Sequence, residues 1–231
     1  FPLLEENLAK GLDSLDFSGN LMIKGAFKGE LIPHFHPSIN LNYEIEEGRF
    51  YDANKKVKLE SLEARGTYRN PDLSKFSNGE FKADTLIGRL NDMTLSGKLN
   101  WFTSQRFPIH AELELNGDLA KINPFLDSIP LTLVKGEFVA KLDGYFDPPD
   151  LKKFGLREWK STEKSLYVLL KNAELIVSDS FPPIQALIAE FALGKNDLYA
   201  KSLVFEIEGM SLSYQGPIMN LISFLDNEAE P

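Results

Sequence analysis

Polar and apolar residues alternate with a period of two along at least seven separate stretches of this 231-residue chain. In residues 39–46 the odd positions are apolar and the even ones are Asn or Glu, and residues 109–115 repeat the pattern. Because successive side chains of a strand point to opposite faces, each stretch predicts a β-strand with one apolar and one polar face. The apolar faces then either pack against a second sheet or stay open to an apolar ligand.

The composition favours a folded protein and argues against several classes of function. Hydrophobic residues make up 43% of the chain and charged residues 26%, which is typical of globular proteins. A net charge of -9 without a basic cluster argues against binding of nucleic acid. Cysteine is absent, which excludes disulfides, thiolate catalysis and cysteine-ligated metals. We expect no cofactor.

The sequence predicts a single β-rich segment over residues 1–231, and the alternative is a subdivision near residues 128–133. It starts at Phe1 rather than Met, so we expect a processed form or a piece of a longer protein. Its apolar runs are far shorter than the about 20 residues of a membrane-spanning helix. The acidic tail, residues 226–231, is expected to be frayed.

Short amphipathic helices are expected between or beside the strands. Apolar residues recur at helical spacing in residues 3–15 and 184–191, and the second segment follows a potential capping Ser180. Residues 119–126 predict one helical turn, and residues 217–225 one or two more. The expected fold is therefore mostly β: an antiparallel, meandering sheet curved into a groove or half-barrel, with short amphipathic helices.

Several phrases of the sequence resemble the AsmA-like proteins of Gram-negative envelopes, which are related to bridge-like lipid transfer proteins. They are SGNLMIKG at residues 18–25, LELNGDL at 113–119 leading into INPFL at 122–126, and GMSLSYQG at 209–216. The resemblance covers roughly residues 17–225. It consists of the order of these segments and their residue pattern, because no segment contains a distinctive chemical group.

The resemblance implies a long, twisted sheet folded into a trough that carries phospholipid acyl chains through the periplasm. It implies a segment of an inner-membrane-anchored protein that supports outer-membrane biogenesis or lipid homeostasis. Membrane contact would occur only through parts of the parent protein absent from this chain. The expected partners are a phospholipid or another acyl lipid, together with other envelope proteins.

The apolar strand positions are the candidate lipid-facing residues. An acyl chain needs a continuous apolar lining, and burial of each CH₂ contributes about 0.8 kcal/mol without a specific polar pocket. The candidates are Ile39, Leu41, Tyr43, Ile45, Leu95, Leu99, Trp101, Ile109, Leu113, Leu115, Phe138, Leu142, Leu166, Val168, Leu170, Phe205 and Ile207.

Sequence patterns that indicate other functions are weaker. Glu112 and Glu114 share one strand face, and glycosidases use paired carboxylates, but a solvated polar face is the simpler interpretation. His34 and His36 stand between two prolines, which indicates a loop rather than a metal site. No catalytic motif occurs, and we expect a non-enzymatic protein. The alternative is a β-sandwich interaction module that binds a protein or glycan at the cell envelope.

Overall fold

The computed structural model describes residues 15–29, 37–52, 57–73, 78–102, 109–125, 131–146, 164–177, 181–193 and 198–218. The chain divides into two compact units, Phe1–Lys98 and Leu99–Pro231, with the division inside one strand. The two units are treated separately below. The expected tail at residues 226–231 lies outside the described residues, and the subdivision near residues 128–133 stays a prediction.

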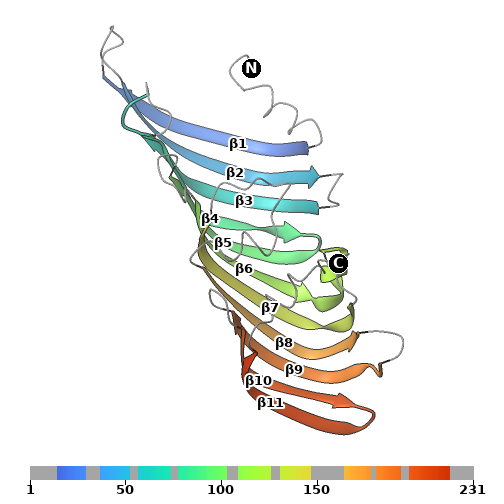
Figure 1. The fold of residues 1–231 in the computed structure, drawn as a ribbon. Coiled ribbons are helices and arrows are strands. Elements are labelled where there is room, and N and C mark those ends of the chain that lie inside the picture. Colours follow the sequence, from blue (N-terminus) through green and yellow to red (C-terminus); the bar gives the residue numbers. More distant parts are fainter. Residues whose placement is uncertain are drawn as a thin grey trace, which may run out of the picture. The chain divides into compact units, whose positions relative to one another are not determined.

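The described residues are almost entirely strands, in one antiparallel meander whose hydrogen-bonded order is the order of the sequence. Figure 1 shows that the individual strands are bowed along their length. The prediction of a curved, groove-like antiparallel sheet is confirmed. Its strands are β1 (Leu15–Lys28), β2 (Ser38–Asp52), β3 (Val57–Asn70), β4 (Glu80–Leu90), β5 (Met93–Phe102), β6 (Ile109–Asp118), β7 (Thr132–Phe146), β8 (Lys164–Ile176), β9 (Ile184–Leu193), β10 (Leu198–Ile207) and β11 (Met210–Ile218).

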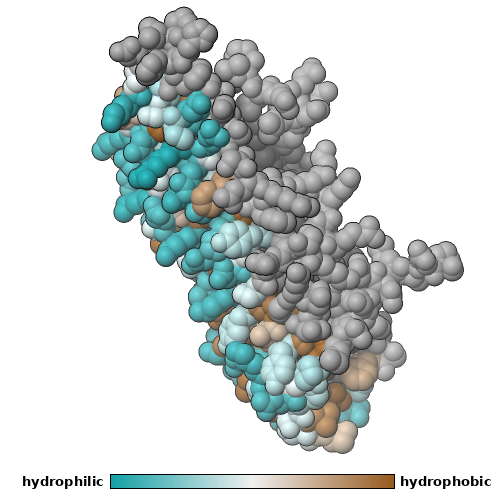
Figure 2. All heavy atoms as spheres, turned by 60° about the vertical axis from the view of Figure 1, so that its left-hand side comes forward, coloured by the Kyte–Doolittle hydropathy of each residue, from teal (hydrophilic) through white to brown (hydrophobic). Residues whose placement is uncertain are grey.

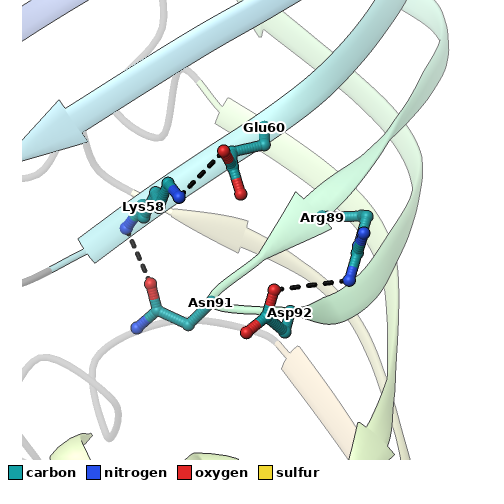
Figure 3. A network of polar contacts seen from close by, with 5 residues as sticks. All are labelled: Lys58, Glu60, Arg89, Asn91 and Asp92. Atoms are coloured by element: carbon teal, nitrogen blue, oxygen red, sulfur yellow. Dashed lines mark hydrogen bonds and ion pairs between the residues drawn. The ribbon is translucent and has the colours of Figure 1, made fainter.

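The hairpin between β4 and β5 turns through Asn91 and Asp92 alone. Both residues have a positive φ, 47° and 67°, which two-residue hairpins whose twist matches their strands require. The Lys58 amide donates to Asn91 Oδ1 at 2.7 Å, and the Asn91 amide donates to the Lys58 carbonyl at 2.8 Å. Ion pairs of Lys58 with Glu60 and of Arg89 with Asp92 flank this contact (Figure 3). The turn is therefore pinned to β3, which fixes the register of the first unit.

Two local features set the register of the second unit. Glu208 and Gly209, with φ of 49° and 79°, form the two-residue turn between β10 and β11. Residues 119–126 were expected to make one helical turn, and a 3₁₀ helix spans Leu119–Phe125. Its Asn123 side chain exchanges two hydrogen bonds with the backbone of Leu133, at 2.8 and 2.9 Å.

The helix predicted over residues 184–191 is wrong, because this segment is strand β9. It pairs with β8 on one side and β10 on the other. The apolar positions fit both periods, and hydrogen bonding to two neighbours decides for the strand. The described part of the chain contains no α-helix. Most of the helix expected at residues 3–15 and residues 219–225 of the last one lie outside the described residues, while Leu15 begins β1 and Ile218 ends β11.

The described strands belong to one sheet order, so no second sheet covers the apolar faces among these residues. Six of the thirteen buried apolar residues in the described ranges are alanine, and their small side chains let larger neighbours lie across them. The buried apolar residues are Tyr43, Leu62, Ala64, Ala83, Met93, Ala111, Leu119, Leu133, Phe138, Ala173, Leu187, Ala189 and Ala200.

Candidate functional site

In the first unit, the predicted apolar positions of β2 do share one sheet face. Strand pairing places side chains of paired residues on the same face, in rows that run across the strands. The four candidates Ile39, Leu41, Tyr43 and Ile45 each begin such a row. The rows are Ile39–Asn70, Leu41–Tyr68–Phe81, Tyr43–Gly66–Ala83 and Ile45–Ala64–Leu86, and β1 extends them with Phe27, Gly25, Ile23 and Leu21 respectively.

Tyr43 fills the middle of this apolar face. Its hydroxyl donates a 2.8 Å hydrogen bond to the Lys82 carbonyl, and its ring stacks on Phe81 at 4.8 Å between centroids. The ring can reach across β3 because Gly66 has no side chain there. Burial, and secondly the charge of Asp84, raises the pKa of the Tyr43 phenol from 10.0 to about 12. The middle of this face is therefore filled by its own side chains, whereas Leu21, Ile23 and Phe27 at its β1 end are 53–71% exposed.

The opposite face of the first unit is polar and paired. Arg65 lies against Glu44 on the neighbouring strand, and Lys82 lies 2.9 Å from Glu80. Hydrophilic side chains predominate on the surface that Figure 2 brings forward. Such exposed ion pairs contribute little to stability, but they keep this face in water. The sheet is thus amphipathic, with a different solvent preference on each side.

The second unit contains an unbroken aliphatic row across six strands. Leu113 pairs with Leu142, Leu142 with Leu166, and the row continues through β9, β10 and β11. Five inter-strand steps of roughly 4.8 Å give the row a length of about 24 Å. Each of the six side chains is half-buried, so each keeps part of its apolar surface accessible. The row comprises Leu113, Leu142, Leu166, Leu193, Leu198 and Ile218.

Two further rows lie beside the aliphatic row on the same face, both on the side of Leu115. Each combines large with small side chains, which keeps the apolar surface continuous without crowding. They include the candidates Leu115, Phe138, Val168 and Leu170. The full rows are Leu115–Ala140–Val168–Phe191–Ala200–Gly216 and Gly117–Phe138–Leu170–Ala189–Leu203–Tyr214.

The remaining candidates also occupy alternate strand positions. Ile109 lies two positions before Ala111 on β6, and Phe205 and Ile207 follow Leu203 at alternate positions of β10. These three therefore share the apolar face of the second unit.

Strand β5 carries the last three candidates. Leu95 belongs to the first unit, and Leu99 and Trp101 belong to the second. Leu99 and Trp101 occupy alternate positions of β5, and Trp101 is exposed.

The acidic pair that suggested an enzyme lies on the polar face of the second unit. Glu114 forms a 2.9 Å ion pair with Lys141, and Glu112 is exposed opposite Asp143. The arrangement is that of a solvated strand face, as the sequence predicts. His34 and His36 lie outside the described residues. Within the part that is described, no group of three or more His, Cys, Asp or Glu is placed to hold a metal ion.

Two shallow depressions open among residues of the polar faces. One, of about 300 Å³, is bordered in the first unit by Lys24, Glu44 and Arg65. The other, of about 490 Å³, is bordered in the second unit by Asn116 and Lys171 among others. Both have mixed charged and apolar linings. Neither includes a member of the aliphatic row.

Sequence reasoning missed the far half of the aliphatic row. Leu193, Leu198 and Ile218 were not candidates, and Phe191 was assigned to a helix. A period-two signal exists in β9, where Leu187, Ala189, Phe191 and Leu193 alternate with Ile188, Glu190 and Ala192. The short segment satisfies a helical period as well, so only pairing with its neighbours reveals the row.

Comparisons with models of protein families, with curated proteins and with solved structures gave no match to this chain. They therefore identify no family, and the AsmA-like resemblance stays a prediction. In the described ranges of the chain, none of the helical structure has the length and apolar character needed to cross a membrane.

Proposed function

We propose that the apolar face of the second unit binds acyl chains of phospholipids or other acyl lipids, without enzymatic chemistry. One observation carries the proposal: six half-buried aliphatic side chains form a row of about 24 Å across β6–β11. That length is of the order of a long acyl chain. No described sheet covers the row, so an extended chain could lie along it.

The energetics of such binding require no specific polar group. Each buried CH₂ contributes about 0.8 kcal/mol, so ten methylenes contribute about 8 kcal/mol before the entropic cost of ordering the chain. An open strip leaves the headgroup in water, which avoids the desolvation of a charged phosphate. This accounts for a binding protein that carries no catalytic or polar recognition motif.

The sequence resemblance gives the proposal its biological setting. If the chain is AsmA-like, the strip is one segment of a lipid path in the periplasm, within an inner-membrane-anchored protein. Its partners would then be phospholipid and neighbouring envelope proteins. The amphipathic sheet supports the lipid-binding part of this proposal, and the setting depends on the sequence phrases alone.

A matched pair of variants on β7 tests the proposal. Leu142→Lys places an ammonium group in the middle of the aliphatic row, whereas Val139→Lys makes a comparable change on the opposite face of the same strand. We expect Leu142→Lys to weaken binding of a fluorescent C16 fatty acid at least tenfold and to reduce lipid that co-purifies, as measured by mass spectrometry. Val139→Lys should bind as the wild type does.

The outcome that counts against the proposal is equally clear. Wild-type protein that carries no lipid and does not bind the C16 probe would exclude the role. Equal weakening by both variants would show that binding does not occur on the predicted face.

A further inference from the structure

Strand β1 is an edge strand with an exposed apolar side. Among the residues that the structure describes, it pairs with β2 alone, and every residue from 16 to 28 is exposed. The apolar residues Phe17, Leu21, Ile23 and Phe27 share one face and are 53–71% exposed. A long, unpaired and apolar edge offers its free backbone amides and carbonyls to another strand.

The other edge of the sheet order differs in a way that matters for pairing. Strand β11 has 9 residues and includes Pro217, which lacks an amide hydrogen. Strand β1 has 14 residues and no proline. Where β2 bulges at Glu47 and Gly48, these two residues of β2 lie opposite a single residue of β1. The alternation of β1 therefore continues past this point, where Gly19 has a positive φ of 139°.

The sequence of β1 is nearly symmetric about Met22. In an antiparallel pair of two copies centred there, each residue faces the one equally distant on the other side of Met22. Phe17 then faces Phe27, and Asp16 faces Lys28 with opposite charge at both ends. The remaining pairs are Gly19 with Gly25, Leu21 with Ile23, Asn20 with Lys24 and Ser18 with Ala26.

We infer that β1 is the interface of a symmetric dimer, in which two copies of this chain join edge to edge about a two-fold axis through Met22. The pairing keeps apolar residues beside apolar residues because paired positions have the same parity and so the same sheet face. It also satisfies the isologous condition of a two-fold interface, in which one patch is complementary to itself. This goes beyond lipid binding, since it places a second copy on the first unit.

Cysteine cross-linking tests the axis directly, because the chain has no cysteine of its own. Residues directly opposite each other in an antiparallel pair have Cα atoms about 4.5–5.5 Å apart, within the range of a disulfide. Met22→Cys should therefore form a disulfide-linked dimer under mild oxidation. Met210→Cys, an exposed methionine on β11, is the matched control and should stay monomeric on a non-reducing gel.

The register has its own test. Position 17 lies about 34 Å along the interface from position 17 of the other copy. Phe17→Cys and Phe27→Cys should each fail to cross-link alone, and an equimolar mixture of the two should cross-link. A mixture that does not cross-link would overturn the proposed register.

The molecular mass of the protein in solution is an independent test of the dimer. The wild-type chain should sediment as a dimer, and Met22→Lys should sediment as a monomer because two ammonium groups would meet on the axis. Met210→Lys should remain dimeric. Wild-type protein that is monomeric at all concentrations tested, or a Met22→Lys variant that remains dimeric, would overturn the inference.

Discussion

The apolar faces of the two units follow the same sequence pattern but differ in what covers them. In the first unit, Tyr43 lies across Gly66, stacks on Phe81 and bonds to the Lys82 carbonyl. In the second unit, the central row is aliphatic on all six strands and half-buried throughout. The first face is filled in its middle by Tyr43, although Leu21, Ile23 and Phe27 at its β1 end are 53–71% exposed. The second face carries an unbroken row of half-buried aliphatic side chains.

This difference shows that alternation alone does not make a ligand surface. A glycine beside a large aromatic residue lets the sheet cover its own face. Aliphatic side chains in one row cannot cover each other in this way, because the neighbours of each side chain are about as long as it is and leave no gap to fill. Lipid binding is therefore expected on the second unit.

The largest expected effect concerns Gly66. A Cβ at this position would lie 1.8 Å from the Lys82 carbonyl oxygen and 2.6 Å from the Tyr43 hydroxyl oxygen. Gly66→Ala should lower the free energy of unfolding of the first unit by about 3 kcal/mol, since backbone must move. Hydrogen exchange of the β2–β4 amides, read by mass spectrometry, measures the loss.

Gly88→Ala is the control for this change. Its nearest atom is the flexible Leu59 Cδ1, 3.2 Å away, and its stability should stay within about 1 kcal/mol of wild type. Equal effects of the two substitutions would mean that Tyr43 does not depend on the gap at Gly66.

The dependence of affinity on acyl-chain length tests the aliphatic row of the second unit. If methylenes lie along the row, adding two of them should tighten binding roughly tenfold, at about 0.8 kcal/mol each. The gain should stop when the chain exceeds the row of about 24 Å. Isothermal titration with saturated fatty acids of 8 to 20 carbons measures this dependence, and an affinity independent of chain length would contradict the strip.

The same substitution at one tyrosine in each unit compares how much the two hydroxyl groups contribute to stability. Tyr43 is buried and its hydroxyl bonds to the Lys82 carbonyl, so Tyr43→Phe should cost about 1 kcal/mol. Tyr214 is 44% exposed and donates to the Pro217 carbonyl at 2.7 Å, so water can replace it, and Tyr214→Phe should cost less than about 0.5 kcal/mol. Urea unfolding of both variants measures the difference. The reverse order would show that the first face is not closed by Tyr43.

A last comparison is the dependence of stability on alkaline pH. The Tyr43 phenol keeps its proton in the folded state up to a pKa of about 12, while the unfolded phenol loses it near 10.0. The folded state then binds more protons between these values, so its stability should be full below pH 10 and fall as the pH rises to 12. Unfolding of wild type and Tyr43→Phe across this range should converge, and parallel curves would reject the assignment.

The sequence predicted much of the architecture from local pattern. Alternation in residues 39–46 of β2 and 109–115 of β6 placed their apolar residues on one face, and the pairing of Leu113 with Leu142 agrees with that placement. The Glu208–Gly209 turn was also predictable, since glycine accepts its positive φ. Segment 184–191 was not, because its apolar residues satisfy the periods of both helix and strand.

The sequence by itself determined which side chains of a strand share a face, because the two-residue period is a property of the extended backbone. Only the tertiary structure decided which faces join into rows, because register depends on hydrogen bonds between segments up to tens of residues apart. It also decided that Tyr43 covers its own sheet while Leu142 and Leu166 remain accessible. That distinction arises from what lies on the neighbouring strand, Gly66 in one case and another leucine in the other.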